Sequence, residues 1–242
     1  MVMNPPQRDD GQHCTHAAVA SSDDVTLPNF LIVGAEKCGT TSLHHYLKQH
    51  PDIYLPVKKE LHYFAYDHIK KTARDPGGQN VLTHACATRE EYDSYYRATG
   101  SHIAIGEMSP SYFYFCNTSE RIKSELGDPK IIIMLRDPVH KAYSQYMHLV
   151  RDNREHLSFF EALMAENQRI EAGWGPLWRY TESSLYSARV SKYLQVFGED
   201  RVKIGLFDDL SRNPQTLVND LFEYLGVAPH DSIDTSRAYN KS

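Results

Sequence analysis

The chain has 242 residues, of which 41% are hydrophobic and 24% charged, an ordinary composition for a soluble globular protein with one sizeable core. Its formal net charge of −5 excludes a broad basic surface, so we expect no nucleic-acid partner. The longest aliphatic run, residues 131–135, is far shorter than the roughly 20 apolar residues that cross a bilayer, so we expect no membrane span.

The segment before residue 28 is polar and lacks the apolar core of a signal peptide. We therefore expect residues 1–27 to be a disordered tail and residues 28–242 to form one domain. The four cysteines include no C-x-x-C pair, which argues against a zinc site or a disulfide scaffold and favours a reducing compartment. We expect a cytoplasmic protein; the alternative is the Golgi lumen, if the chain is a fragment that lacks its anchor.

From residue 29 onward, short apolar segments alternate with amphipathic ones. In chain order, the patterns predict strands over 30–33, 103–105, 130–135 and 201–207, and helices over 40–49, 138–151, 157–170, 184–197 and 214–224. Such alternation indicates an α/β fold with a central parallel sheet flanked by helices. Ligands of these sheets bind beyond the carboxyl ends of the strands, which directs attention to the turns after Val33 and Leu135.

The turn after the first predicted strand has the composition of a phosphate-binding loop. Its glycines let the backbone approach an anion, and the helix that follows directs N–H groups and its positive dipole end at the same place. In a nucleoside-triphosphate loop, G-x-x-x-x-G-K-[ST], a lysine follows the second glycine, whereas here Thr40 stands there and Lys37 lies inside the loop. A lysine at that place lies near a 5′-phosphate and the group leaving from it. The residues that we expect to bind this phosphate are Lys37, Cys38, Gly39, Thr40, Thr41 and Ser42.

A second anion site is predicted after the strand KIIIML. Arg136 ends that strand, where a guanidinium can bind a phosphate through two hydrogen bonds, and Ser144 follows about two helical turns later. Two phosphate sites on one sheet suit a nucleoside that carries phosphates at both ends. The alternative is that Arg136 pairs with Asp137 or Glu107 at the edge of the sheet.

These segments resemble the PAPS-dependent sulfotransferase family over most of residues 29–227, where PAPS is 3′-phosphoadenosine-5′-phosphosulfate. The family's 5′-phosphosulfate loop is similar to FLIVGAEKCGTTSLHHYLKQHP, its 3′-phosphate element to IIIMLRDPVHKAYSQYMH, and its late strand and helix to RVKIGLFDDLSRNPQTLVNDLFEYLGV. The resemblance implies a three-layer P-loop-like fold and sulfuryl transfer from PAPS to a hydroxyl or amine, with PAP as product and no metal.

The segment KELHYF, which begins at Lys59, is similar to the acidic-x-His-aromatic-Phe segment of the heparan-sulfate type and its bacterial relatives. There the carboxylate is the catalytic base, which implies that role for Glu60, with His62 beside it. This branch implies a carbohydrate acceptor, and a small metabolite is the alternative. The competing interpretation is that Glu60, which follows Lys58 and Lys59, is a solvated surface charge.

Two departures from the family pattern are visible. Where GEMSPSYF resembles a segment that often carries a catalytic lysine before serine, this chain has Met108, so a second cation is absent or supplied elsewhere. Family members also continue into a basic, glycine-containing loop, so we expect a truncated C-terminus or another way of closing the site. Two further alternatives stay open: a P-loop kinase that uses ATP and Mg²⁺, and a non-catalytic PAP-binding pseudoenzyme. The sequence leaves the oligomeric state open.

Overall fold

The computed structural model describes residues 25–97, 99–230, 232–237 and 239. Within these residues, five strands form one sheet in the order β2-β3-β1-β4-β5, and every neighbouring pair is parallel. The strands are β1 (Phe30–Gly34), β2 (Ile53–Tyr54), β3 (Ala104–Met108), β4 (Lys130–Leu135) and β5 (Val202–Leu206). The predicted central parallel sheet is therefore confirmed. The predicted tail lies outside the described residues except for its last three, of which Val25 forms an antiparallel bridge with Arg97.

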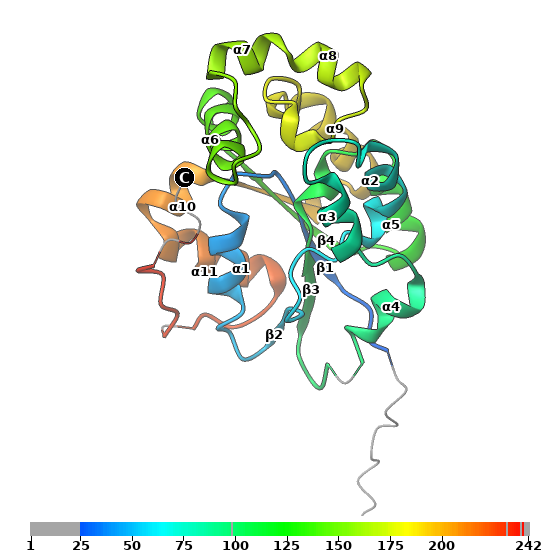
Figure 1. Ribbon diagram of the computed structural model, residues 1–242. Helices are drawn as coiled ribbons and strands as arrows, with labels where there is room; N and C mark the ends of the chain where they lie inside the picture. The colour runs from blue at the N-terminus through cyan, green and yellow to red at the C-terminus, as the bar shows by residue number, and fades with distance from the viewer. Residues whose placement is uncertain (1–24, 98, 231, 238, 240–242) are drawn as a thin grey trace, which may run out of the picture.

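Helices cover both faces of the sheet and complete three layers (Figure 1). One face carries α1 (Thr40–Leu47) and α11 (Pro214–Leu225), which contact each other. The other face carries α5 (Thr118–Leu126) and α9 (Ser187–Phe197), which also contact each other. The remaining helices are α2 (Tyr66–Thr72), α3 (Gly78–His84), α4 (Arg89–Ser94), α6 (Pro138–Arg151), α7 (Phe159–Met164), α8 (Glu166–Glu171) and α10 (Phe207–Arg212). No helix in the described part of the chain is long and apolar enough to cross a membrane.

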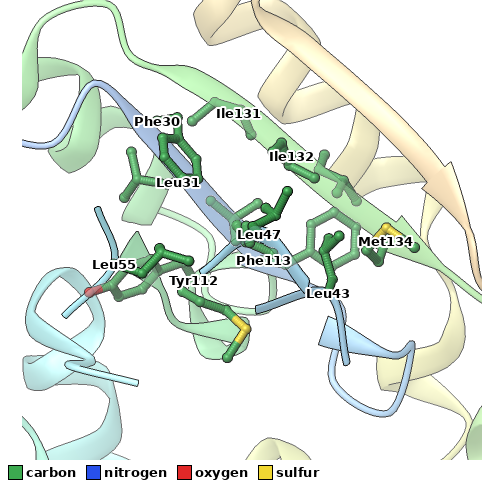
Figure 2. Close-up of a cluster of buried hydrophobic side chains, with 14 of the residues drawn as sticks. Phe30, Leu31, Leu43, Leu47, Leu55, Tyr112, Phe113, Ile131, Ile132 and Met134 are labelled. Carbon is green, nitrogen blue, oxygen red and sulfur yellow. The ribbon is translucent and has the colours of Figure 1, made fainter. Parts of the chain in front are cut away.

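The core forms around β1 and β4, two neighbouring strands in the interior of the sheet. All five residues of β1 are buried, as are the four inner residues of β4, because a parallel strand between two helical layers needs apolar side chains on both faces. Figure 2 shows side chains of these strands packed with those of α1 and of the segment after β3, including Phe30, Leu31, Leu43, Leu47, Phe113, Ile131, Ile132 and Met134. This packing fixes the loops that leave the two strands.

The strand order places one crevice at the centre of the sheet. After β1 the chain moves to β2 at one edge, whereas after β4 it moves to β5 at the other edge. Ligands of parallel α/β sheets bind where the direction changes in this way, between the carboxyl ends of two neighbouring strands. The pairing of β1 and β4 continues beyond Gly34, since the Ala35 N–H donates to the Met134 carbonyl at 2.7 Å. The turns after β1 and β4 therefore begin side by side.

Several predicted boundaries need correction. The predicted ranges 130–135 and 138–151 match β4 and α6, but the predicted single helix 157–170 is wrong, since it is divided into α7 and α8 at residue 165. The change of direction lets the buried Glu166 accept hydrogen bonds from the N–H groups of Thr181 and Glu182, each at 2.8 Å. The predicted helix 184–197 begins at residue 187, and the predicted strand 201–207 ends at 206 because Phe207 starts α10. The short elements β2, α2, α3, α4, α5 and α10 were not predicted.

A buried carboxyl group on β3 organises the segments beside the crevice. Glu107 is 1% exposed and accepts hydrogen bonds from the hydroxyls of Tyr92 at 2.8 Å, Tyr112 at 2.5 Å and Ser109 at 2.6 Å. The Ser109 hydroxyl oxygen in turn accepts from the His62 N–H at 3.0 Å. Burial raises the pKa of Glu107 to about 7, against the opposing effect of the hydroxyl donors.

We predict that Glu107→Gln removes a pH dependence of stability. The pKa of Glu107 is about 7 in the folded protein against an ordinary 4.5, so the folded state binds this proton more tightly. The resulting stabilisation is present below pH 4.5 and is lost as the pH rises through 7, by about 3 kcal/mol. The free energy of unfolding, measured with urea from about pH 4 to about pH 8, covers both pKa values. It should decline in the wild type and in the exposed control Glu171→Gln, but not in Glu107→Gln. Parallel curves for all three would contradict the assignment.

Candidate active site

A cavity of about 860 Å³ lies at the crevice between β1 and β4. Its lining includes both predicted phosphate-binding turns and the segment that follows Lys59. The predicted site residues that line it are Lys37, Gly39, Thr40, Thr41, Ser42, Glu60, His62, Arg136 and Ser144. The structure thus brings together every predicted site residue except Cys38, which lies outside the lining.

The loop after β1 curves around the N-terminus of α1. Lys37 and Gly39 have φ angles of 63° and 84°, in the left-handed region, which is unfavourable for lysine and easy for glycine. Cys38 is fully buried behind the loop, and its N–H donates to the Ala35 carbonyl at 3.3 Å. Because the N-cap residue Gly39 has no side chain to accept from the first turn, the N–H groups at the start of α1 are suited to an anion in the cavity.

The turn after β4 contacts this loop directly. The Arg136 guanidinium donates from Nη1 to the Lys37 carbonyl at 3.3 Å and lies 4.3 Å from the centre of the Phe207 ring. Ser144, one buried position on α6, also lines the cavity. The alternative pairing of Arg136 is not seen, since Asp137 caps α6 by accepting from the His140 N–H at 2.9 Å and Glu107 binds hydroxyls.

The segment that carries the predicted base lies against the end of β3. The Glu60 N–H donates to the Met108 carbonyl at 3.0 Å. Met108 is buried, and its thioether side chain carries no charge, so this position supplies no cation. The Glu60 carboxylate lies 3.7 Å from His62 Nε2, while Nδ1 of the same ring is 2.8 Å from the Ser111 hydroxyl. Glu60 is half-buried and faces the cavity, which disagrees with the interpretation that it is only a solvated surface charge.

The backbone is strained at the predicted catalytic residues. Among the described residues, four that are not glycine have a positive φ, and three of them are Lys37, Glu60 and His62. Such conformations cost about 1–3 kcal/mol each and persist where the surrounding structure holds them. Here the buried network of Glu107 and Ser109 holds the segment that contains His62. This concentration of strain at one cavity is typical of a functional site.

Burial also shifts the pKa values of two of these groups. Burial lowers the pKa of Lys37, and the positive charges of Arg151 and Arg136 lower it further, against the opposing effect of Glu36. Burial lowers the pKa of His62 as well, more than the Glu60 carboxylate raises it, so the imidazole is neutral at pH 7. An anion that binds beside Lys37 restores the stability of its charged form.

Sequence reasoning missed much of the lining, including Phe207 and residues near the described C-terminal end. Phe207 follows β5 directly, and its place at the carboxyl end of a parallel strand was the available signal. Residues 234–237 and 239 lie against α1 and the residues that follow it: Tyr239 stacks on His45 at 4.0 Å, and its N–H donates to the Ser42 hydroxyl at 2.9 Å. No local pattern marks that segment. In the described part of the chain, no group of three or more His, Cys, Asp and Glu side chains is placed to hold a metal ion.

Comparisons with known proteins agree on one family. The profile of the sulfotransferase family matches residues 28–231. A solved sulfotransferase from Alicyclobacillus acidocaldarius is 43% identical, with a TM-score of 0.85 over 89% of this chain and 87% of that chain. Carbohydrate sulfotransferase 15 of Mus musculus is 25% identical over 84% of this chain and 44% of its own length.

A more distant structure shares the fold alone. Mouse sulfotransferase SULT7A1 complexed with PAP is 15% identical, with a TM-score of 0.53 over 90% of this chain and 66% of that chain. The curated relatives are longer proteins, since this chain spans from 22% to 50% of their length. The matched part is therefore the α/β domain that contains the cavity.

We predict that Gly39→Ala destabilises the protein more than a matched variant does. A Cβ at position 39 would lie 2.5 Å from Leu210 Cδ2 and 3.0 Å from Phe207 Cδ2. The control Gly226→Ala has nearly the same φ, 83° against 84°, but its Cβ would meet only the Lys130 ammonium at 3.8 Å. In both variants alanine must adopt an unfavourable positive φ. Only Gly39→Ala should lose a further ~1–3 kcal/mol of unfolding free energy through overpacking. Equal losses in the free energy of unfolding would show that the side chains of α10 move aside and that the added Cβ is not overpacked.

Proposed function

Since this chain belongs to the sulfotransferase family, we propose that it transfers a sulfuryl group from PAPS to a hydroxyl or amine of a carbohydrate or small metabolite. The observation that carries the proposal is the contact between two anion-binding turns in one cavity, where Arg136 donates to the Lys37 carbonyl at 3.3 Å. A donor with phosphates at both ends of a nucleoside needs two such turns on one side of a sheet.

The residues present suit the two phosphates of the donor. Lys37, the N–H groups at the start of α1 and the hydroxyl of Thr41 suit the 5′-phosphosulfate, because helix N-termini and ammonium groups stabilise anions. Arg136 and Ser144 suit the 3′-phosphate, which distinguishes PAPS from ATP. The Phe207 ring beneath the guanidinium holds it in place for this contact.

Glu60 and Lys37 supply the chemistry in this proposal. Glu60 accepts the proton of the acceptor as the acceptor oxygen or nitrogen bonds to sulfur. Lys37 donates to the oxygen that leaves with the electron pair of the broken S–O bond, where negative charge builds. The neutral His62, 3.7 Å from Glu60, orients the carboxylate and is itself held by Ser111. Transfer of this kind depends mainly on positioning and on charge stabilisation.

The acceptor would enter from the side of Glu60 and His62. Beyond these residues the lining continues to α2 and α3, with apolar Ile69 and Val81 and the carboxylate of Asp75. Such a mixed surface suits a carbohydrate or another small alcohol or amine. The names of the curated relatives, among them carbohydrate sulfotransferase 15, support the carbohydrate class.

Binding of PAP and transfer from radiolabelled PAPS test the donor. The wild type should bind PAP more tightly than 5′-AMP, which lacks the 3′-phosphate, and should label an acceptor in a pool of carbohydrates, phenols and amines. Arg136→Ala should weaken PAP by at least about tenfold and leave 5′-AMP nearly unchanged, because a charge-assisted contact to the 3′-phosphate is lost. The exposed Arg212→Ala is the control, since that guanidinium lies 3.6 Å from Asp208 and is outside the cavity lining.

Three results would contradict this proposal. Equal affinity for PAP and 5′-AMP would show that Arg136 does not bind a 3′-phosphate. Phosphoryl transfer from ATP that depends on Mg²⁺ would identify a P-loop kinase. Tight PAP binding without labelling of any acceptor would identify a non-catalytic PAP-binding protein.

We predict that Glu60→Gln slows the chemical step and spares the nucleotide. Without a proton acceptor beside the cavity, kcat should fall by about 10²- to 10⁴-fold, while the affinity for PAP stays near that of the wild type. The control is Glu91→Gln, whose carboxylate lies 3.8 Å from Lys58 and outside the cavity lining. If PAP affinity fell together with kcat, Glu60 would be a structural residue, and the base would lie elsewhere.

A further inference from the structure

A second ammonium group lies between the predicted base and the phosphate-binding helix. Lys59 Nζ donates to the Thr41 hydroxyl oxygen at 2.9 Å and lies 3.4 Å from the Glu60 carboxylate. Thr41 stands in the first turn of α1 and lines the cavity, whereas Lys59 lies behind it, outside the lining. One half-buried cation therefore joins the base to the helix N-terminus that faces the donor site.

The neighbouring lysine points elsewhere, although the two residues look equivalent in the sequence. Lys58 Nζ lies 3.8 Å from the Glu91 carboxylate and 5.4 Å from the centre of the Tyr95 ring. These contacts hold it to α4, away from α1. The two side chains are equally exposed, 30% and 29%, and differ in their partners, so Lys58 is a matched control for Lys59.

The backbone fixes Lys59 in this place. Glu60 has a φ of 63° and donates its N–H to the Met108 carbonyl at 3.0 Å, which holds the segment against the end of β3. From there the Lys59 side chain reaches the first turn of α1, where it contacts Thr41. Met108, the last residue of β3, carries no charge. Lys59 therefore provides the cation near this end of β3.

We propose that Lys59 is a positioning residue for sulfuryl transfer, acting through Thr41 and Glu60; this inference rests on the proposed function. In the transfer, the acceptor gives its proton to Glu60 and bonds to sulfur, while the bond between sulfur and the 5′-phosphate oxygen breaks and that oxygen keeps the electron pair. Negative charge thus moves from the Glu60 carboxylate to the 5′-phosphate. Lys59 contacts the Glu60 carboxylate directly and adjoins the 5′-phosphate site through Thr41. Its positive charge therefore lies beside negative charge throughout the step.

This placement affects the transition state more than the bound donor. Charge on the 5′-phosphate increases as the S–O bond breaks, and an ammonium already in position stabilises that increase without reorganisation. The hydrogen bond from Lys59 also polarises the Thr41 hydroxyl and makes it a stronger donor. Lys59 should therefore influence kcat more than the affinity for PAP.

Steady-state turnover and PAP binding of Lys59→Met, Lys59→Arg and Lys58→Met test the proposal. Lys59→Met should lower kcat by about tenfold to a hundredfold and change PAP affinity by much less, since a charge near the reacting atoms is lost. Lys59→Arg should keep most of the wild-type kcat because arginine keeps the positive charge. Lys58→Met should stay within about twofold of the wild type, because Lys58 and its partner Glu91 both lie outside the cavity lining. Combining Lys59→Met with Thr41→Val should cost less than the sum of the two single changes.

Three outcomes would overturn the inference while the proposed function stands, provided that the wild type transfers sulfuryl groups. The first is a kcat of Lys59→Met equal to that of Lys58→Met, and the second is a loss of PAP affinity that accounts for the whole loss of kcat. The third is a double variant with Thr41→Val whose loss equals the sum of the two single losses. Failure of Lys59→Arg to recover activity, with an unfolding midpoint equal to that of the wild type, would also overturn it, because a charge effect would be absent. A wild-type protein that transfers no sulfuryl group would overturn the proposed function, and this inference with it.

Discussion

The parallel pairing of β1 with β4 is the constraint on which the site depends. Neighbouring parallel strands end at the same edge of a sheet, so the loop with Lys37 and the turn with Arg136 leave the sheet side by side. The pairing extends past β1 through the hydrogen bond from the Ala35 N–H to the Met134 carbonyl, and the two turns meet where Arg136 donates to the Lys37 carbonyl. A slip in this register would separate the two cations and divide the cavity.

The buried interior supplies the free energy that holds strained residues at the cavity. Lys37, Glu60 and His62 all adopt left-handed backbone conformations, which isolated chains avoid. The carboxyl of Glu107 anchors Ser109, which fixes the His62 N–H, and β3 fixes the Glu60 N–H through its last carbonyl. Glu60, the proposed base, is thus attached to the sheet itself, so the sheet sets its position relative to the loop that carries Lys37.

Charged side chains from three elements gather at the cavity. Two cations, Lys37 and Arg136, come from the two turns, and a third, Lys59, reaches α1 from the end of β3. The carboxylate of Glu60 lies between Lys59 and a neutral imidazole. In a cavity partly shielded from water, such fixed charges act more strongly than they would at an open surface. The membership in the sulfotransferase family and this arrangement point to the same chemistry from independent observations.

The strand KIIIML, the helix that follows it and the parallel sheet could be predicted from the sequence alone, because each depends on a local pattern of side chains. Three features became visible in the folded chain alone: the division of the predicted helix 157–170 at residue 165, the different partners of Lys58 and Lys59, and the contact of Ser42 with Tyr239. The last two residues are 197 positions apart. Contacts at that separation form when the whole core packs, and no periodicity within one segment carries them.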